Sequence, residues 1–280
     1  MHVSFALRPG KFFVGQLLAA MGMPQSAAFP SGLDNPKRKV TLGPLFHNEL
    51  EFWRWFVDKR LAYRGGHFSS PMYNIIRPPK LPMFTDASKS AFGGYCLQTG
   101  HFFRHELSAE EKSRFCGSSK HFTGYNDNSI NVLELLGMLV GAWMLVVTER
   151  RRPVTAGDCV LLRGDNKPSV AWIRRCRGGK ELRSGALMRM LGALEVSSGW
   201  HSQSSHVSGV LNYLADGIWR WDAPDVRANL IAACPQVRWR QVDIGEDGRR
   251  ICSAVLASTS CGTQLRQRLS ALTCGILDNS

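Results

Sequence analysis

One segment limits the choice of fold more than any other: the run from Ile130 to Val147 is apolar at almost every position. Its apolar residues recur at helical spacing, which predicts a helix covered by other elements on most of its surface. Glu134 carries the only charge in this run. A buried carboxylate without a partner costs several kcal/mol or takes up a proton. Glu134 therefore either lies at an exposed edge of the helix or meets a cation, and the helix alone does not decide between these alternatives.

Strand patterns before and after this helix predict an α/β fold. Short Gly-containing connections between the first three strands favour an antiparallel meander. The predicted order is β-β-β-α-β-α(-α)-β-α, which is typical of a mixed five-stranded sheet flanked by helices. The predicted strands are 83–86, 92–97, 101–106, 159–163 and 200–207, and the later helices are 169–175, 181–196 and 212–221. The polar segment 108–128 is expected to be irregular, except that Ser108, followed by Glu110 and Glu111, would cap a short helix.

Three further carboxylates stand where predicted elements begin or end. Asp86 lies inside a strand pattern, although aspartate is a poor strand former, and small residues follow it. Asp165 follows the apolar run 160–162, at the carboxyl end of a strand, where α/β proteins gather ligand sites. Asp216 falls in the first turn of a helix. Each also has a simpler explanation, because turns favour aspartate and helix dipoles favour an acid in the first turn.

Together with Glu134, these residues occupy a strand, a helix, a strand end and a helix start, in that order. Grouping four carboxylates is electrostatically costly without a cation. Mg²⁺ binds through oxygen ligands, and two such ions about 4 Å apart assist phosphodiester hydrolysis. If the four residues meet in the fold, the cluster is therefore a metal site.

Composition and charge favour a polyanionic partner. The chain of 280 residues has 44% hydrophobic and 20% charged residues, which argues against disorder, and its formal net charge is +13. This surplus makes nucleic acid the first candidate, with a basic surface that binds no partner as the alternative.

The eight cysteines include no C-x-x-C pair, which disfavours a zinc ribbon. No signal peptide is recognisable, and the apolar run 135–147 is shorter than the roughly 20 residues of a membrane span. We therefore expect reduced thiols, no membrane partner and a cytoplasmic or nuclear location.

The segments on either side of this pattern are less informative. Residues 1–75 are aromatic-rich, and 45–61 has the pattern of an amphipathic helix that packs on a core, with a nucleic-acid platform as the alternative. The proline-rich run 77–82 predicts a linker. It divides a helical segment, 1–79, from the main domain, 80–222. The extension 223–280 has a helix-like pattern around 264–272 and no motif.

Five segments, in this order, resemble the ribonuclease H-like domain of retrotransposon reverse transcriptases. They are Thr85-Asp86-Ala87-Ser88, Phe92-Gly93-Gly94-Tyr95, Ile130-Asn131-Val132-Leu133-Glu134-Leu135-Leu136, Asp165-Asn166, and the run from His206 to Asp216 with its histidine, glycine, asparagine and Ala-Asp. The motifs Ile-Asn-x-Leu-Glu and Asn-x-x-Ala-Asp are similar to those of DIRS-type and Ty3-like elements. Residues 1–79 would then be similar to the thumb or connection of the polyprotein. The chain departs from the family after Asp216, where the family often has Leu-Ser-Arg and this chain has Ile218-Trp219-Arg220. We expect Trp219 to act as a packing residue.

The resemblance implies a metal-dependent endonuclease that hydrolyses the RNA strand of RNA–DNA hybrids and leaves 5′-phosphate and 3′-hydroxyl ends. Asp86, Glu134, Asp165 and Asp216 would hold two Mg²⁺ ions, with Mn²⁺ as the alternative, and Asp86 would be shared. His206 would assist proton transfer or product release, with a plain strand-end histidine as the alternative. The basic run after Asp165 would track the phosphate backbone, although such runs are usually solvated helix faces. The expected nucleic-acid contacts are Ser88, Asn166, Arg174, Arg175, Arg177, Lys180 and Asn212.

Two other functions stay open at this point. The chain could be an inactive retroelement remnant that binds nucleic acid without cleaving it, or a subunit that works only with the polymerase part of the same polyprotein. The Tyr-x-Asp-Asp signature of the polymerase is absent from this chain, so we do not expect it to polymerise by itself. Integrases and resolvases also place acidic clusters on this fold, but Glu134 on the first helix favours the ribonuclease H branch.

Overall fold

The protein is described from a computed structural model, which places residues 78–117, 130–148, 158–178, 182–198 and 200–256. Nearly all of the predicted segment 1–79 lies outside these described residues. So do Lys180 and the helix-like pattern at 264–272.

A six-stranded mixed sheet forms the centre, in the order β5-β4-β1-β2-β3-β6. The strands are β1 (Leu81–Ala87), β2 (Ala91–Cys96), β3 (His101–Glu106), β4 (Cys159–Gly164), β5 (His201–His206) and β6 (Arg240–Gln241). The first three are antiparallel, whereas β4 runs parallel to both β1 and β5. The predicted mixed α/β sheet is confirmed, but the number of strands was one too low. The missed strand, β6, pairs with β3 over two residues, which is too short for a strand pattern to show in the sequence.

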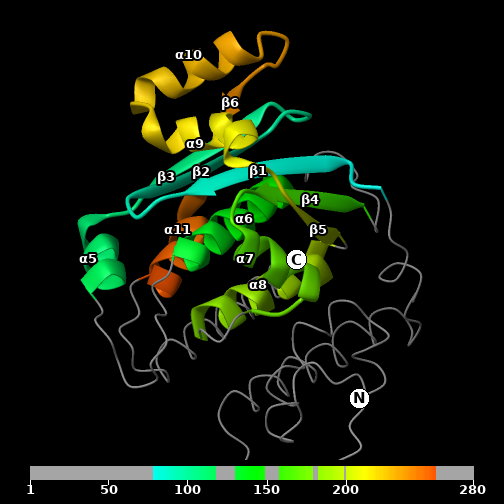
Figure 1. Cartoon of the computed structure of the whole chain (residues 1–280), viewed down its shortest axis with the longest axis vertical. Coiled ribbons are helices and arrows are strands. Elements are labelled where there is room, and N and C mark those ends of the chain that lie inside the picture. Colours follow the sequence, from blue (N-terminus) through cyan, green and yellow to red (C-terminus); the bar gives the residue numbers. More distant parts are fainter. Residues whose placement is uncertain (1–77, 118–129, 149–157, 179–181, 199, 257–280) are drawn as a thin grey trace, which may run out of the picture. The chain divides into compact units, whose positions relative to one another are not determined.

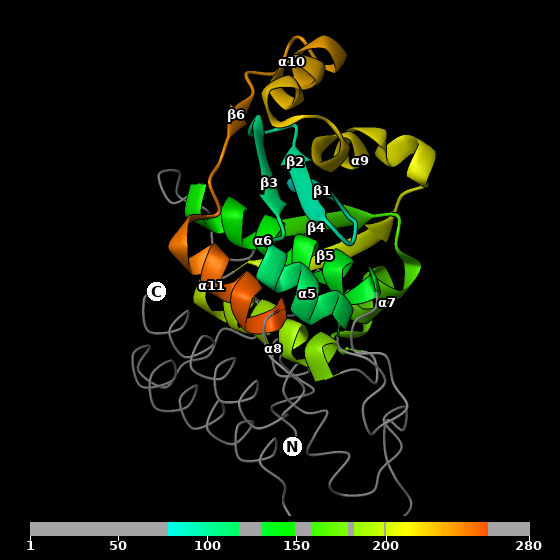
Figure 2. The same ribbon diagram turned by 90° about the vertical axis from the view of Figure 1, so that its left-hand side faces the viewer.

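Helices cover both faces of this sheet (Figure 1). In that view α6, α7 and α8 lie below the sheet, and α9 and α10 lie above it. Figure 2, turned by 90°, shows α5 next to α11, and the two helices are in contact. The four predicted helices that fall in the described residues, at 130–147, 169–175, 181–196 and 212–221, are present within two residues of their expected bounds. The described helices are α5 (Ala109–Gly117), α6 (Ile130–Thr148), α7 (Lys167–Arg175), α8 (Leu182–Ser198), α9 (Tyr213–Arg220), α10 (Ala223–Ala233) and α11 (Gly245–Leu256), with a 3₁₀ turn, η4 (Gly209–Asn212), before α9.

The apolar helix α6 is covered on almost every side, as its sequence predicts. It lies close against β1, because Gly141 has no side chain there: a Cβ at this position would lie 2.8 Å from Cγ of Met83. On its other sides α6 contacts α7, α8 and α11. Leu133 and Leu136 are fully buried as a result. Any charge on the first turns of this helix must therefore find a partner inside the protein or at the edge of the sheet.

The chain beyond the predicted domain boundary at residue 222 continues the fold. Val226 of α10 packs with Tyr95 and Phe102 of the sheet in one buried cluster. Trp239 joins the same cluster and meets the rings of Tyr95 and Phe102 edge-on, with centroids 5.9 and 6.4 Å apart. The main domain therefore extends past 222, because later residues complete the core on the α9 face of the sheet.

One local expectation, the cap of a short helix after Ser108, is confirmed. Ser108 and Glu111 form a capping box at the start of α5: the backbone N–H of Ser108 donates to Oε2 of Glu111 (2.8 Å), and the N–H of Glu111 donates to Oγ of Ser108 (3.1 Å). None of the five cysteines with described side chains forms a disulfide. In the part of the chain that the structure describes, no helix is long and apolar enough to cross a membrane.

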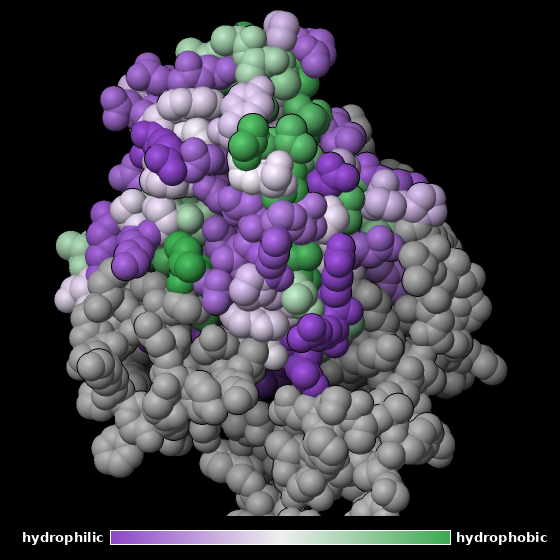
Figure 3. All heavy atoms as spheres, in the orientation of Figure 1, coloured by the Kyte–Doolittle hydropathy of each residue, from purple (hydrophilic) through white to green (hydrophobic). Residues whose placement is uncertain are grey.

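The coloured, described part of the face drawn in Figure 3 is mostly hydrophilic, with small hydrophobic patches between the polar side chains. The exposed apolar residues include Val210 and Leu211 in η4 and Tyr213 at the start of α9. They belong to the segment between the end of β5 and the first turn of α9.

Candidate metal centre

The carboxyl ends of β1 and β4 lie side by side and carry two of the predicted carboxylates. In this parallel pair Phe84 is the partner of Arg163. Asp86 stands two residues after the first and Asp165 two residues after the second, so both reach the same edge of the sheet. Asp86 is buried, with 6% of its surface exposed, and Asp165 is half-buried.

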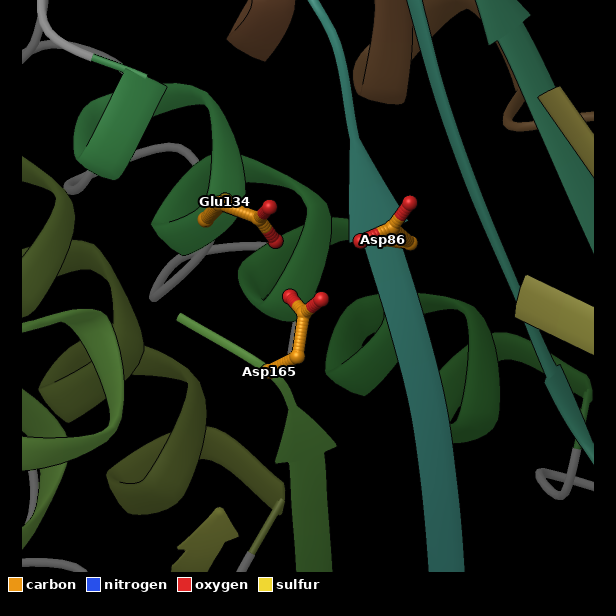
Figure 4. A group of neighbouring side chains, drawn as sticks. All are labelled: Asp86, Glu134 and Asp165. Carbon is orange, nitrogen blue, oxygen red and sulfur yellow. The ribbon is translucent and has the colours of Figure 1, made fainter. Parts of the chain in front are cut away.

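Glu134 reaches this edge from the beginning of α6 (Figure 4). One carboxylate oxygen from each of Asp86, Glu134 and Asp165 lies within 4.8 Å of the other two. Glu134 is only 4% exposed, so the alternative of an exposed helix edge is wrong. Its Oε2 is buried and has no hydrogen-bond partner within the described ranges. A buried acceptor without a partner is costly, and a cation at this point would satisfy it.

The group raises the pKa of two of its members. Burial raises the pKa of Glu134 to about 9, and the charges of Asp86 and Asp165 act in the same direction. Burial likewise raises the pKa of Asp86 to about 7; a hydrogen bond from Trp219 lowers it, and the charges of Asp165 and Asp216 raise it. Without a cation, the group therefore holds protons near neutral pH, and a divalent ion would favour the ionised carboxylates.

The fourth predicted carboxylate, Asp216, is close to this group but is not a member of it. Its charge raises the pKa of Asp86. Its own Oδ1, however, accepts a 2.6 Å hydrogen bond from Nε of Arg220, one turn later on α9. Among the described residues, the group of mutually close ligand atoms contains Asp86, Glu134 and Asp165 and omits Asp216. The structure thus brings together three of the four predicted carboxylates.

One glycine in β2, Gly93, lets α9 lie close to the sheet. A Cβ on Gly93 would lie 2.5 Å from Cγ2 of Ile218 in α9, and Gly93 is the strand partner of Asp86. The end of α9 is therefore held over Asp86. There the indole Nε1 of Trp219 donates a 2.6 Å hydrogen bond to Oδ2 of Asp86. The expectation that Trp219 only packs missed this contact, and the only signal for it in the sequence was the departure from the family pattern.

His206 lies at the end of β5, beside the backbone of Asp165. Its Nε2 is 3.0 Å from the carbonyl oxygen of Asp165, and the residue is exposed. Gly209 approaches the same aspartate from η4: a Cβ at this position would lie 3.1 Å from Oδ2 of Asp165. The predicted histidine is therefore next to the carboxylate group without being part of it, and Gly209 keeps the space beside Asp165 open.

The two asparagines predicted to contact nucleic acid are engaged inside the protein. The prediction for Asn212 is wrong, because this side chain is fully buried and donates from Nδ2 to the carbonyl oxygen of Thr85 (3.0 Å). Asn166 caps α7, where its Oδ1 accepts from the N–H of Ser169 (3.0 Å) and its Nδ2 donates to Oδ1 of Asn131 (2.9 Å). Asn212 instead holds the backbone carbonyl of Thr85, the residue before Asp86. Asn166, the residue after Asp165, holds the first turn of α7.

The other residues predicted to contact nucleic acid differ in exposure. The hydroxyl of Ser88 is used in the turn between β1 and β2, where it accepts backbone N–H donors (3.1 Å). Arg174 and Arg175 are exposed at the end of α7, and Nε of Arg174 donates to a β5 carbonyl (3.2 Å). Arg177 is half-buried, and Lys180 lies outside the described residues. The exposed pair Arg174 and Arg175 is therefore the part of the basic run that is open to a ligand.

Comparison with known proteins finds no relative: no protein-family model, no curated protein and no solved structure matches the chain. The fold and the site by themselves define a mixed α/β domain with a buried acidic group that could hold a metal ion.

Proposed function

We propose that the protein is a metal-dependent endonuclease that hydrolyses the RNA strand of RNA–DNA hybrids, as part of a retroelement reverse transcriptase. The observation that carries the proposal is the meeting of Asp86, Glu134 and Asp165 within 4.8 Å at the carboxyl edge of the sheet. A strand, the first long helix and the end of a parallel strand supply these carboxylates. These are the elements from which the ribonuclease H resemblance expects them.

The residues of this group fit a hard divalent cation such as Mg²⁺ or Mn²⁺. All three offer carboxylate oxygens, the ligands that such ions prefer. The buried, unpaired Oε2 of Glu134 is the acceptor that an ion would satisfy, and Gly209 leaves room beside Asp165. When bound, the ion would supply Lewis-acid stabilisation of the phosphodiester and lower the pKa of a water molecule. The second ion that the resemblance implies would need Asp216 beside Asp86, where Trp219 already donates to Oδ2 of Asp86.

His206 takes the proton-transfer role in this proposal. Its Nε2 faces the carbonyl oxygen of Asp165, which fixes the ring beside the carboxylate group. Its Nδ1, on the other side of the ring, is then the nitrogen that exchanges a proton with the substrate or product. Because the residue is exposed, nucleic acid can reach it without a rearrangement of the core.

Exposed cations support nucleic acid as the substrate. The helix α7 begins at Lys167, two residues after Asp165, and ends at Arg175, roughly 12 Å further along the helix axis. Lys167, Arg174 and Arg175 are exposed and would contact backbone phosphates away from the cleaved bond. RNA would be distinguished through its 2′-hydroxyl groups and the shape of the minor groove. Binding through these residues would weaken steeply as salt is added.

Cleavage of a labelled RNA–DNA hybrid in Mg²⁺ tests the proposal, with wild type compared to Asp86→Asn. The matched control is Asp158→Asn, which makes the same chemical change just before β4, where Asp158 pairs with Lys80. Metal-dependent cutting of the RNA strand that is lost in Asp86→Asn and kept in Asp158→Asn supports the proposal. Tight hybrid binding without cleavage in any of the three proteins would sink it for the isolated chain.

A second candidate function is binding of nucleic acid without cleavage. It is favoured by the partners that two of the four predicted carboxylates already have: Trp219 on Asp86 and Arg220 on Asp216. A gel-shift measurement beside the cleavage assay separates this candidate from the nuclease. Adding the polymerase part of the polyprotein in trans then tests whether cleavage needs that partner.

A further inference from the structure

The indole of Trp219 occupies one oxygen of the carboxylate that two ions would have to share. Its Nε1 donates to Oδ2 of Asp86 at 2.6 Å. An indole nitrogen is a donor and never an acceptor, so this group cannot itself hold a cation. It also points a partly positive hydrogen at the oxygen that it contacts. A carboxylate oxygen has two lone pairs and the indole N–H takes one of them, so an ion at Oδ2 would have to share this oxygen with the donor or displace the indole.

Arg220 holds this indole in place and supplies a positive charge to the neighbouring carboxylate. Its guanidinium carbon lies 4.6 Å from the centre of the Trp219 ring, in a cation–π contact. Its Nε donates to Oδ1 of Asp216 at 2.6 Å. Trp219 thus contacts both Asp86 and Arg220, and Asp216 is paired with the same arginine.

The side of the group formed by Glu134 and Asp165 still has a carboxylate oxygen without a donor. Glu134 is 4% exposed, and its buried Oε2 has no hydrogen-bond partner in the described part of the chain. Asp165 has beside it the space that Gly209 leaves. The acceptors left for a cation are therefore on the side of Glu134 and Asp165, whereas the side of Asp216 carries a tryptophan N–H and a guanidinium.

We propose that this group takes one divalent cation, held by Asp86, Glu134 and Asp165, and that Trp219 keeps a second ion away from the side of Asp86 that faces Asp216. The inference rests on the proposed function in one respect, because it needs the group to bind metal. Trp219 then sets how many ions bind and not whether an ion binds. The second ion enters only when the indole leaves Oδ2 of Asp86.

Titration of the full chain with Mn²⁺, followed by the electron paramagnetic resonance signal of the free ion, measures the number of bound ions without any cleavage. We expect one Mn²⁺ for each wild-type chain and two for Trp219→Phe, which keeps an aromatic ring beside Arg220 and removes the donor. The matched control is Trp221→Phe, at the end of the same helix, where the indole packs against Gly217. This control is expected to bind one ion.

A variant at Arg220 guards against a folding defect in Trp219→Phe. The Arg220 side chain is 61% exposed, so Arg220→Gln leaves the core untouched. It removes both the support of the indole and the competing charge at Asp216. We expect a weak second Mn²⁺ site in this variant, which wild type lacks, and weaker binding there than in Trp219→Phe, because an exposed ion pair of this kind contributes little.

The outcomes separate this inference from the proposed function. Two ions in wild type, or one ion in both wild type and Trp219→Phe, would overturn the role of Trp219 and leave the metal-dependent nuclease standing. An absence of Mn²⁺ binding in wild type would overturn both. One ion in wild type and in Trp221→Phe, with two in Trp219→Phe, is the expected result.

Discussion

Two buried glutamates on helices, Glu111 and Glu134, differ in what surrounds them. Glu111 is 8% exposed and Glu134 4%. The carboxylate of Glu111 accepts the N–H of Ser108, and its Oε2 lies 3.5 Å from Nε2 of His105. Glu134 instead faces the carboxylates of Asp86 and Asp165, with one backbone hydrogen bond from Ala87. Burial is therefore similar at the two positions, and the partners are opposite in kind.

The effect on the pKa follows from these partners. Burial acts to raise the pKa of Glu111, but hydrogen bonds and charge from His105 and hydrogen bonds with Ser108 outweigh it and hold the pKa below its usual value. Burial raises the pKa of Glu134 to about 9, and the neighbouring carboxylates add to the shift. A buried acid with donors around it stabilises the fold, whereas a buried acid among other acids is a cost that a bound cation would remove. The comparison therefore favours Glu134, and not Glu111, as a candidate metal ligand.

The largest effect that this comparison predicts is on cleavage. Under the proposed function, Glu134→Gln should reduce the rate of hybrid cleavage in saturating Mg²⁺ by about 10³-fold, equivalent to roughly 4 kcal/mol of transition-state stabilisation. Glu111→Gln makes the same change on a helix away from the carboxylate group and should cleave at nearly the wild-type rate. Initial rates on one labelled hybrid measure both. Cleavage by Glu134→Gln at the wild-type rate would contradict the proposed role of Glu134 in cleavage.

The next effect is on stability as the pH changes, measured in EDTA. The folded-state pKa values of Glu134 and Asp86, about 9 and about 7, lie above their ordinary values, so the folded chain binds more protons than the unfolded chain between about pH 4.5 and 9. The free energy of unfolding should therefore fall by several kcal/mol as the pH rises from 5 to 8. Urea unfolding at several pH values tests this, and Glu134→Gln should flatten the curve.

The same urea unfolding at several pH values should give the opposite pH dependence for the contribution of Glu111. Its pKa is lowered in the folded chain, so its contribution to stability is present above the ordinary glutamate pKa and is lost as the pH falls below it. Glu111→Gln should therefore weaken the loss of stability in acid and leave the slope between pH 5 and 8 unchanged. A slope that responds equally to both substitutions would contradict the difference between the two glutamates.

A smaller effect is expected from the metal itself. Mn²⁺ at about 100 times its dissociation constant should raise the free energy of unfolding by about 2.7 kcal/mol. Urea unfolding in Mn²⁺ and in EDTA measures the difference. The gain should vanish in Glu134→Gln and persist in Glu111→Gln, since only the first substitution removes a proposed ligand. Equal gains in the two variants would place the ion elsewhere in the chain.

The smallest effect concerns the cap of α5. Ser108→Ala removes the hydroxyl that accepts the N–H of Glu111, and we expect a loss of about 1 kcal/mol in the free energy of unfolding. Mn²⁺ binding should stay unchanged, because the cap shares no hydrogen bond with the carboxylate group. Urea unfolding and the Mn²⁺ titration check the two halves of this prediction separately.

Much of the fold and of the candidate site followed from local patterns in the sequence. A single charge in an apolar helix marked Glu134, and positions in or just after strand patterns marked Asp86 and Asp165. The order of strands and helices predicted a mixed sheet, and parallel neighbours in such a sheet end at the same edge. These features could be predicted because periodicity and strand ends are properties of short, continuous segments.

What the tertiary structure decided are contacts between segments far apart in the chain. Trp219 and Asp86 are 133 residues apart, and they meet because Gly93 lets α9 settle onto β2. Asn212 lies inside the protein for a similar reason, since its partner Thr85 is 127 residues away. The sequence by itself determined which residues could bind a cation. Only the packing of α9 on the sheet decided which of them have partners within the protein, because a hydrogen bond depends on distance in space and not on spacing along the chain.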